Sequence, residues 1–139
     1  MKTLVVYFSL TGNTKVVAEK IAKKLNADID SIIDTAKVGD KGVMKEVNID
    51  FKKDPSKYDL VVIGSPVWAF GIPPFTKKYL QNNKFGKVAF FCTFSLNSCL
   101  LFSKMKKFSK KPIAVLKIKS GQINNSDKEI ELFCKKLAN

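Results

Sequence analysis

Three continuous runs of apolar residues, each about the length of one strand, stand out along this chain of 139 residues. They cover residues 4–8, 60–63 and 88–92, and each is followed by small or polar residues. Continuous hydrophobicity is typical of strands buried on both faces, as in a parallel sheet. Residues 29–33 are mixed, and the run over 112–119 changes from continuous to alternating. The pattern therefore predicts three central strands and two edge strands.

Between these strands, apolar residues recur at helical spacing, with lysines and acids on the other faces. The stripes are Val17, Ile21 and Leu25; Leu101, Phe102, Met105 and Phe108; and Ile130, Phe133, Cys134 and Leu137. Pro73-Pro74 is suited to opening a further helix, and Ser126 with Glu129 forms a capping-box pattern before the last one. Residues 35–57 are lysine-rich and weakly periodic, and they predict only a poor helix and a long approach to the third strand.

The alternation of strands and helices predicts an α/β fold, in which right-handed crossovers build a parallel sheet with helices on both faces. In this three-layer sandwich, a five-stranded parallel sheet in the order 2-1-3-4-5 buries strands 1, 3 and 4, as the hydrophobicity requires. The length fits one domain over residues 1–139. The ligand crevice of such a sheet lies at the carboxyl ends of strands 1 and 3.

The loop after the first strand has the composition of an anion-binding site. Residues 9–14 read Ser-Leu-Thr-Gly-Asn-Thr and provide three hydroxyls and an amide side chain ahead of a helix. Helix N-termini present unpaired N–H groups and a partial positive charge, so they can hold a phosphate without a cationic side chain. Gly12 allows close approach or a positive φ. The alternative is a simple helix cap made by Asn13 or Thr14.

The loop after the third strand carries the only tryptophan of the chain. Residues 64–74 combine Trp68 and Phe70 with glycines and prolines that would fix the path of the loop. A planar ligand packed against Trp68 would explain aromatic residues at this position. The alternative is that Trp68 folds back over the core.

These two segments resemble the flavodoxin family, and residues 58–69 in particular are similar to its third strand and first flavin-side loop. The similarity covers essentially the whole chain and is of the short-chain type. It implies noncovalent FMN, with Ser9, Thr11, Asn13 and Thr14 on the phosphate and Trp68 along the isoalloxazine. The cofactor-binding residues that we expect are Ser9, Leu10, Thr11, Gly12, Asn13, Thr14, Pro66, Val67, Trp68, Ala69, Phe70, Gly71, Thr93, Phe94, Ser95 and Asn97.

Residues 93–98 follow the fourth strand, where flavodoxins place their second flavin-side loop. Phe94 is a candidate for stacking on the flavin, or alternatively for the core. The segment departs from the family because it contains no glycine and no acid. Cys92 and Cys99 lie nearby, and we interpret them as small buried hydrophobic residues.

Composition excludes several kinds of chemistry. The 25 cationic residues are all lysine, against 12 acids, and there is no histidine. Histidine-based triads and zinc sites are therefore excluded, as is the cysteine–arginine mechanism of the low-molecular-weight tyrosine phosphatases, whose sheet is related. No catalytic residue and no metal site is expected. Three cysteines without a CxxC spacing, and no apolar stretch long enough for a signal or membrane segment, favour a cytoplasmic protein without membrane association.

The leading hypothesis is an FMN-binding electron-transfer protein that serves a redox partner protein. The net charge of +13 reverses the acidic character usual in flavodoxins and favours an acidic partner. Nucleic acid is not expected as a partner, because arginine is absent and the lysines of 104–111 interleave with a core stripe. The alternatives are an FMN-dependent NAD(P)H oxidoreductase acting on a quinone or similar acceptor, and a domain that serves interaction only.

Overall fold

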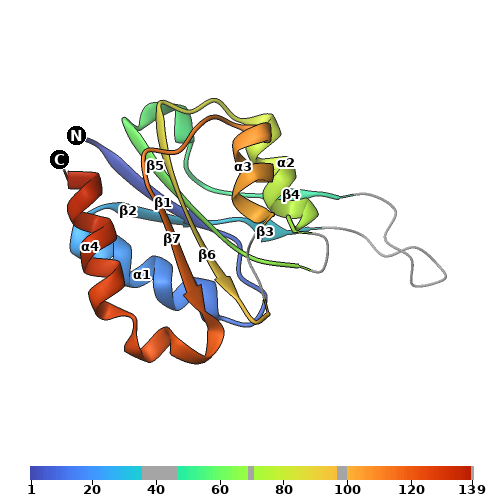
Figure 1. Ribbon diagram of the computed structural model, residues 1–139. Coiled ribbons are helices and arrows are strands. Elements are labelled where there is room, and N and C mark those ends of the chain that lie inside the picture. The colour runs from blue at the N-terminus through green and yellow to red at the C-terminus, as the bar shows by residue number, and fades with distance from the viewer. Residues whose placement is uncertain (36–46, 69–70, 97–99, 139) are drawn as a thin grey trace.

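Five parallel strands form the central sheet, in the order β2-β1-β5-β6-β7 (Figure 1). The computed structural model describes residues 1–35, 47–68, 71–96 and 100–138. The strands are β1 Thr3–Tyr7, β2 Asp28–Ser31, β3 Ile33–Asp34, β4 Ile49–Asp50, β5 Leu60–Pro66, β6 Lys87–Phe94 and β7 Val115–Lys119. The α-helices are α1 Asn13–Leu25, α2 Pro74–Asn82, α3 Leu101–Phe108 and α4 Asp127–Ala138, and the 3-10 helices are η1 Pro55–Lys57 and η2 Ser120–Asn125.

This order is the 2-1-3-4-5 arrangement predicted from hydrophobicity, with β5, β6 and β7 as the third, fourth and fifth core strands. The central strands β1, β5 and β6 are buried along almost their whole length. The edge strand β7 instead alternates, with Leu116 and Ile118 buried between exposed neighbours. The predicted distinction between central and edge strands is confirmed.

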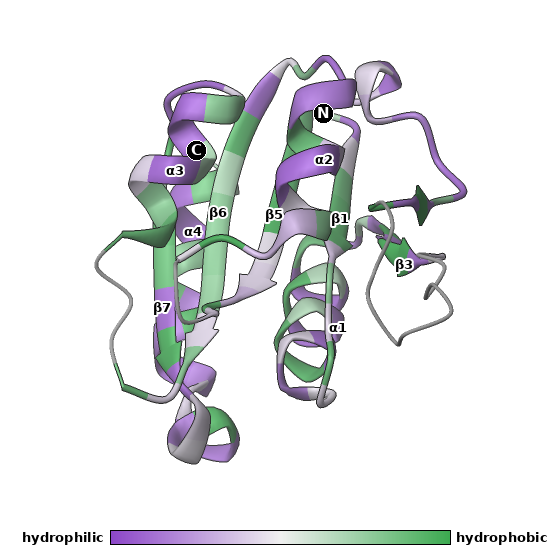
Figure 2. Ribbon diagram, turned by 90° about the vertical axis from the view of Figure 1, so that its right-hand side faces the viewer, coloured by the Kyte–Doolittle hydropathy of each residue, from purple (hydrophilic) through white to green (hydrophobic). Residues whose placement is uncertain are grey.

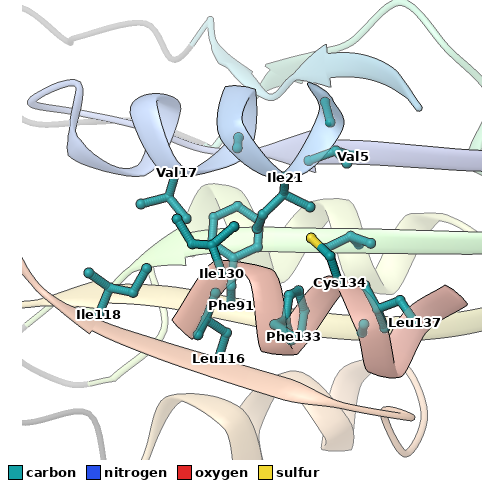
Figure 3. Packing of buried hydrophobic residues seen from close by; sticks show 14 of the residues in the cluster. Val5, Val17, Ile21, Phe91, Leu116, Ile118, Ile130, Phe133, Cys134 and Leu137 are labelled. Atoms are coloured by element: carbon teal, nitrogen blue, oxygen red, sulfur yellow. The ribbon is translucent and has the colours of Figure 1, made fainter. Parts of the chain in front are cut away.

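The sheet separates two hydrophobic cores. On one face, α1 and α4 bring Val17, Ile21 and Ile130 onto Phe91 of β6 (Figure 3). On the other face, α2 and α3 cover the side chains that point the opposite way from the same strands, including Phe90 and Cys92. Figure 2 shows the corresponding pattern, with β6 hydrophobic along most of its length and α1 alternating between hydrophobic and hydrophilic residues. The helical stripes predicted from the sequence therefore face the cores.

Two central strands extend further than the sequence predicted. β5 continues through Gly64 and Ser65 to Pro66, and β6 continues to Thr93 and Phe94, and these ends pair with each other in parallel register. Gly64 has a packing reason to be glycine, because a Cβ there would lie 1.9 Å from Cζ of Phe91. Gly64 thus belongs to the strand, and the expectation that it shapes a loop is wrong.

The approach to β5 also differs from expectation. Its described part, residues 47–57, contains no α-helix; β4 pairs antiparallel with β3, and η1 follows. Residues 36–46 lie outside the described residues. Asp30 fixes this approach, since one carboxylate oxygen accepts hydrogen bonds from the backbone N–H groups of Lys52 at 2.9 Å and Lys53 at 2.7 Å. A buried carboxylate held by backbone donors joins edge strand β2 to the segment that leads into the sheet centre.

α2 and α4 begin where the sequence predicted, but the Ser126 hydroxyl makes a different hydrogen bond from that of a capping box. α2 begins at Pro74, as the Pro73-Pro74 pair suggested, and Ser126 directly precedes α4. The Ser126 hydroxyl donates to the carbonyl of Ile123 at 2.6 Å, which ties α4 to the preceding η2. Among the described residues, no helix is both long and apolar enough to cross a membrane.

Candidate functional site

A cavity of about 290 Å³ opens at the carboxyl edge of the sheet, beside the start of α1. It is lined by Leu10, Thr11, Asn13, Pro66, Val67, Trp68, Thr93, Phe94, Ser95 and Ser120. The lining thus unites residues from all three segments that the sequence singled out. Those described residues that line the cavity include no charged side chain.

Ser120 is the cavity residue that the sequence reasoning missed. It directly follows edge strand β7, and its hydroxyl donates to the carbonyl oxygen of Phe94 at 3.1 Å. This bond connects the end of β7 to the end of β6. The available signal was position, because the carboxyl ends of parallel strands meet at one edge and Ser120 ends the fifth core strand.

The loop before α1 is shaped by Ser9 and Gly12. The Ser9 hydroxyl oxygen accepts hydrogen bonds from the backbone N–H groups of Gly12 at 3.1 Å and Lys15 at 3.3 Å. Gly12 takes the N-cap position with φ of 96°, and a Cβ there would meet nothing within 4 Å. The glycine is therefore required by its backbone angle, and the space beside it is open. The alternative of a side-chain cap by Asn13 or Thr14 is wrong, because the cap is Gly12 and makes no side-chain hydrogen bond.

Among the described residues, two amides at this helix start have no hydrogen-bond acceptor. The first turn of a helix offers no acceptor to its own N–H groups. Here the N–H of Lys15 is taken by Ser9 and that of Val16 by the Gly12 carbonyl at 3.1 Å. The N–H groups of Asn13 and Thr14 therefore have no acceptor within the helix, and they carry its partial positive charge. Thr11 is exposed next to them, and Asn13 lines the cavity.

Thr14 differs from the other hydroxyl residues of this loop. It is 1% exposed and is not among the residues that line the cavity. Its hydroxyl oxygen lies 2.8 Å from that of Thr93, at the end of β6. Thr14 and Thr93 thus form a buried hydroxyl pair between α1 and the sheet.

Trp68 both lines the cavity and packs on the core. Its ring makes edge contacts with Phe8 and Phe75, with ring centroids 5.9 Å apart in each case. Its backbone exchanges two hydrogen bonds with Gly71, at 3.2 and 2.8 Å, and Gly71 has φ of 98°. The alternative that Trp68 packs on the core is therefore confirmed, and because Trp68 also lines the cavity, contact with a ligand stays a prediction.

Three of the expected binding residues, Ala69, Phe70 and Asn97, lie outside the described residues. Thr93 and Phe94 belong to β6, so their placement in a loop after the strand is wrong. Phe94 is half-buried and packs against the core on the α2/α3 face while lining the cavity. Pro66 likewise belongs to β5, and the backbone N–H of Val67 donates to the Thr93 carbonyl at 3.1 Å.

A second cavity, of about 340 Å³, lies on the other side of the same loop, between the ends of β1 and β2. Lys15, Ser31 and Asp34 are among its lining residues, and Leu10 borders both cavities. Burial raises the pKa of Tyr7, which also lines it, and the nearby carboxylates of Glu19 and Asp30 raise it further. This cavity is lined by side chains of both charges and not by Trp68 or Phe94, so the first cavity is the stronger candidate site.

The cysteine thiols that the structure describes are unsuited to redox chemistry. Cys92 is fully buried, and this burial raises its pKa to about 12, so it stays a neutral thiol near neutral pH. Burial likewise raises the pKa of Cys134. The interpretation of Cys92 as a small hydrophobic residue agrees with its place in the core, and Cys99 lies outside the described residues.

Residues 4–127 match the flavodoxin domain family, and the chain belongs to that family. A flavoprotein from Lactobacillus acidophilus NCFM, solved in complex with FMN, is 24% identical with a TM-score of 0.69, over 89% of this chain and 97% of that one. Oxidised flavodoxin 2 from Bacillus cereus is 20% identical with a TM-score of 0.66, over 99% and 98%. Two-electron reduced Megasphaera elsdenii flavodoxin is 18% identical with a TM-score of 0.59, over 99% and 99%. A comparison with curated proteins finds no match.

The local chemistry of the cavity fits the phosphate and the ring of FMN. Thr11 and Asn13 at the start of α1, and the absence of a carboxylate among the described lining residues, suit a dianionic phosphate, whereas the expected Ser9 and Gly12 line the second cavity. Trp68 and Phe94 provide apolar surface for a planar ring on the opposite side. The residues present can therefore hold this cofactor.

Proposed function

We propose that the protein binds FMN noncovalently in this cavity and acts as an electron carrier. The observation that supports the proposal best is one cavity, with no charged side chain among its described lining residues, that joins the start of α1 to Trp68 after β5 and Phe94 at the end of β6. When bound, FMN would supply the one-electron and hydride chemistry for which the protein lacks side chains.

In this proposal the loop before α1 binds the phosphate. Thr11 and Asn13 donate side-chain hydrogen bonds, and the amides of Asn13 and Thr14 add backbone donors. Ser9 holds the loop in the required shape by accepting from Gly12 and Lys15. A cation is not needed at the phosphate itself, which agrees with a chain that contains no arginine.

Trp68 and Phe94 orient the ring and keep water from it. Packing against Phe8 and Phe75 fixes the Trp68 side chain before any ligand arrives. Phe94 is fixed by its place in the last part of β6. Both residues therefore present rigid apolar surface, which reduces the ordering cost of binding.

The first experiment is to purify the protein, to measure bound flavin, and to titrate FMN and riboflavin separately. We expect Thr11→Ala to weaken FMN binding and to leave riboflavin binding nearly unchanged, because riboflavin lacks the phosphate. Thr3→Ala is the matched control, since Thr3 begins β1 at the opposite end of the strand. If the unmodified protein binds neither flavin, the proposal is wrong. If Thr11→Ala weakens the binding of FMN and riboflavin equally, the assignment of Thr11 to the phosphate is wrong.

The second experiment separates a carrier from a reductase. Anaerobic mixing with NAD(P)H alone should leave the visible absorbance of the bound flavin unchanged if the protein only carries electrons. Rapid bleaching, with turnover of a quinone, would favour the alternative of an FMN-dependent NAD(P)H oxidoreductase.

We further propose that the redox partner is a protein with an acidic surface. The net charge of +13 supports attraction of negative partners. Exposed Leu10 lines the cavity, and exposed Leu96 follows the lining residue Ser95, so both are candidates for apolar contacts with a partner. Complex formation with an acidic electron-transfer protein should weaken steeply between low and physiological salt. A salt-independent affinity would contradict this proposal.

The same charge should affect the redox potential. A lysine about 8 Å from an added electron, at an effective dielectric near 20, stabilises it by about 2 kcal/mol, on the order of 90 mV for one electron. We therefore expect the second reduction step at a less negative potential than in acidic flavodoxins. A redox titration that gives an equally low or lower potential would contradict this expectation.

A further inference from the structure

The charged residues are distributed unevenly along the chain. Residues 60–126 contain eleven lysines and neither aspartate nor glutamate, whereas the rest of the chain carries the other fourteen lysines and all 12 acids. The acid-free segment runs from β5 through α2, β6, α3 and β7 to η2. One continuous part of the fold therefore carries most of the net charge of +13.

The fold gathers six of these lysines on one side of the sheet. Leu116 and Ile118 of β7 point into the core beneath α1 and α4. Lys117 and Lys119 alternate with them and therefore point to the other side, which α3 covers (Figure 1). The exposed lysines of α3, of the turn after it and of β7 form what we call the lysine surface, which consists of Lys106, Lys107, Lys110, Lys111, Lys117 and Lys119.

The acids that could neutralise this charge lie elsewhere. The ion pairs found among the described residues belong to α1 and α4, where Lys20 lies 2.9 Å from Asp127 and Lys135 lies 3.6 Å from Glu131. Further acids are carried by β2, β3 and β4, and β2 forms the opposite edge of the sheet from β7. Within the described part of the chain, the lysine surface therefore has no ion-pair partner.

The lysine surface adjoins the candidate cavity. Lys119 pairs in register with Phe94, which lines the cavity from the end of β6, and it directly precedes Ser120, which also lines it. Phe94 packs on the α2/α3 side, to which Lys119 also points. A partner bound on the lysine surface would therefore lie next to the ring half of the proposed FMN site.

Protection of an open sheet edge does not account for this arrangement. Lysines on an edge strand prevent unwanted strand pairing, which would explain Lys117 and Lys119. It would not explain the lysines of α3 or the absence of acids from residues 60–126. Two apolar side chains are also exposed beside these lysines, Ile113 at 49% and Val115 at 45%. Cationic and apolar groups together suit a protein partner, and the lack of arginine disfavours nucleic acid.

We propose that the lysine surface is the docking site of an acidic protein partner. The acidic side chains of the partner pair with the lysines, and Ile113 and Val115 supply apolar contact. The concentration of charge on one side would also orient the partner before contact and speed its association. The inference rests on the proposed function only for the redox role of that partner.

The test measures the binding of a fluorescently labelled polyglutamate peptide by anisotropy, at low salt, with and without added FMN. The variant Lys106→Gln/Lys117→Gln/Lys119→Gln removes three exposed cations from the lysine surface. We expect it to weaken polyglutamate binding about fivefold, the combined scale of three exposed charge pairs. The difference should vanish at about 0.5 M salt.

Lys23→Gln/Lys128→Gln/Lys136→Gln is the matched control, because it removes the same charge from exposed positions on α1 and α4. It should weaken binding by about twofold or less. Circular dichroism should confirm that both variants keep the fold.

Equal losses in the two triple variants would overturn the inference, because attraction would then follow net charge alone. Tighter binding of a single-stranded oligonucleotide than of polyglutamate, at equal ligand charge and salt, would overturn it in favour of nucleic acid. If the protein binds no flavin, the proposed function is wrong, whereas the docking surface is still decided by the anisotropy of the flavin-free protein.

Discussion

The two halves of the candidate site are built in different ways. The proposed phosphate half is the loop before α1. Its contacts are local in sequence, because Ser9 accepts hydrogen bonds from residues three and six positions later. The aromatic half is assembled from distant segments, with Trp68 held by Phe8 and Phe75 and with Phe94 set by the length of β6. Substitutions in the phosphate half should therefore have little effect on the stability of the fold. Substitutions in the aromatic half should affect stability as well, because its residues pack on the core.

The largest effect is expected in the core beneath α1 and α4, on the face of the sheet opposite to the aromatic half. Gly64→Ala places a Cβ 1.9 Å from Cζ of Phe91, and such overpacking should lower the free energy of unfolding by about 3 kcal/mol in urea denaturation. Gly121→Ala is the control, since a Cβ there meets nothing within 4 Å. Adding Phe91→Leu to Gly64→Ala should recover part of the loss, and simple additivity would show that the two residues do not clash.

Removing the ring that serves both core and cavity should come next. Trp68→Ala loses the edge contacts with Phe8 and Phe75 and should weaken FMN and riboflavin by the same factor, roughly tenfold. Trp68→Phe should retain most of the affinity. Fluorescence quenching of each flavin measures both constants, and a loss confined to FMN would place Trp68 with the phosphate half.

Ser9→Ala tests the local half. The variant removes the acceptor of two backbone N–H groups, an effect of about 1 kcal/mol for capping hydroxyls, so FMN affinity should fall roughly fivefold. Riboflavin affinity should not change. Ser56→Ala, which removes an exposed hydroxyl that bonds Asp54, is the control. A Ser9→Ala protein with full FMN affinity would mean that the loop keeps its shape without this side chain.

The smallest effect is expected from charge. Lys15 is exposed beside the loop, so Lys15→Gln should weaken FMN only about twofold, with the difference removed by about 0.5 M salt. Lys23→Gln, an exposed position near the other end of α1, should have no effect on FMN. A tenfold loss on Lys15→Gln would show that the phosphate half depends on a cation after all.

The same contrast explains how far the sequence predicted the structure. Strand order depends on continuous apolar runs, and the position of the loop before α1 at the cavity follows from that order, so both could be predicted from the chain. The ends of β5 and β6 were misplaced because Ser65 and Thr93 look like loop residues until their buried hydroxyl partners, Thr76 and Thr14, are known. Ser120 was missed because only the assembled sheet brings it to the cavity.

The longer reach of β5 and β6 has a consequence for the way in which a ligand would leave the cavity. Pro66 and Thr93 are paired within the sheet ladder, so the floor of the site belongs to the same cooperative unit as the core. Local opening that releases a ligand would then be confined to the rim, at Leu10 and Ser95. We expect the backbone amide of Thr93 to exchange its hydrogen slowly and that of Ser95 to exchange fast, although the two residues are only two positions apart in the chain.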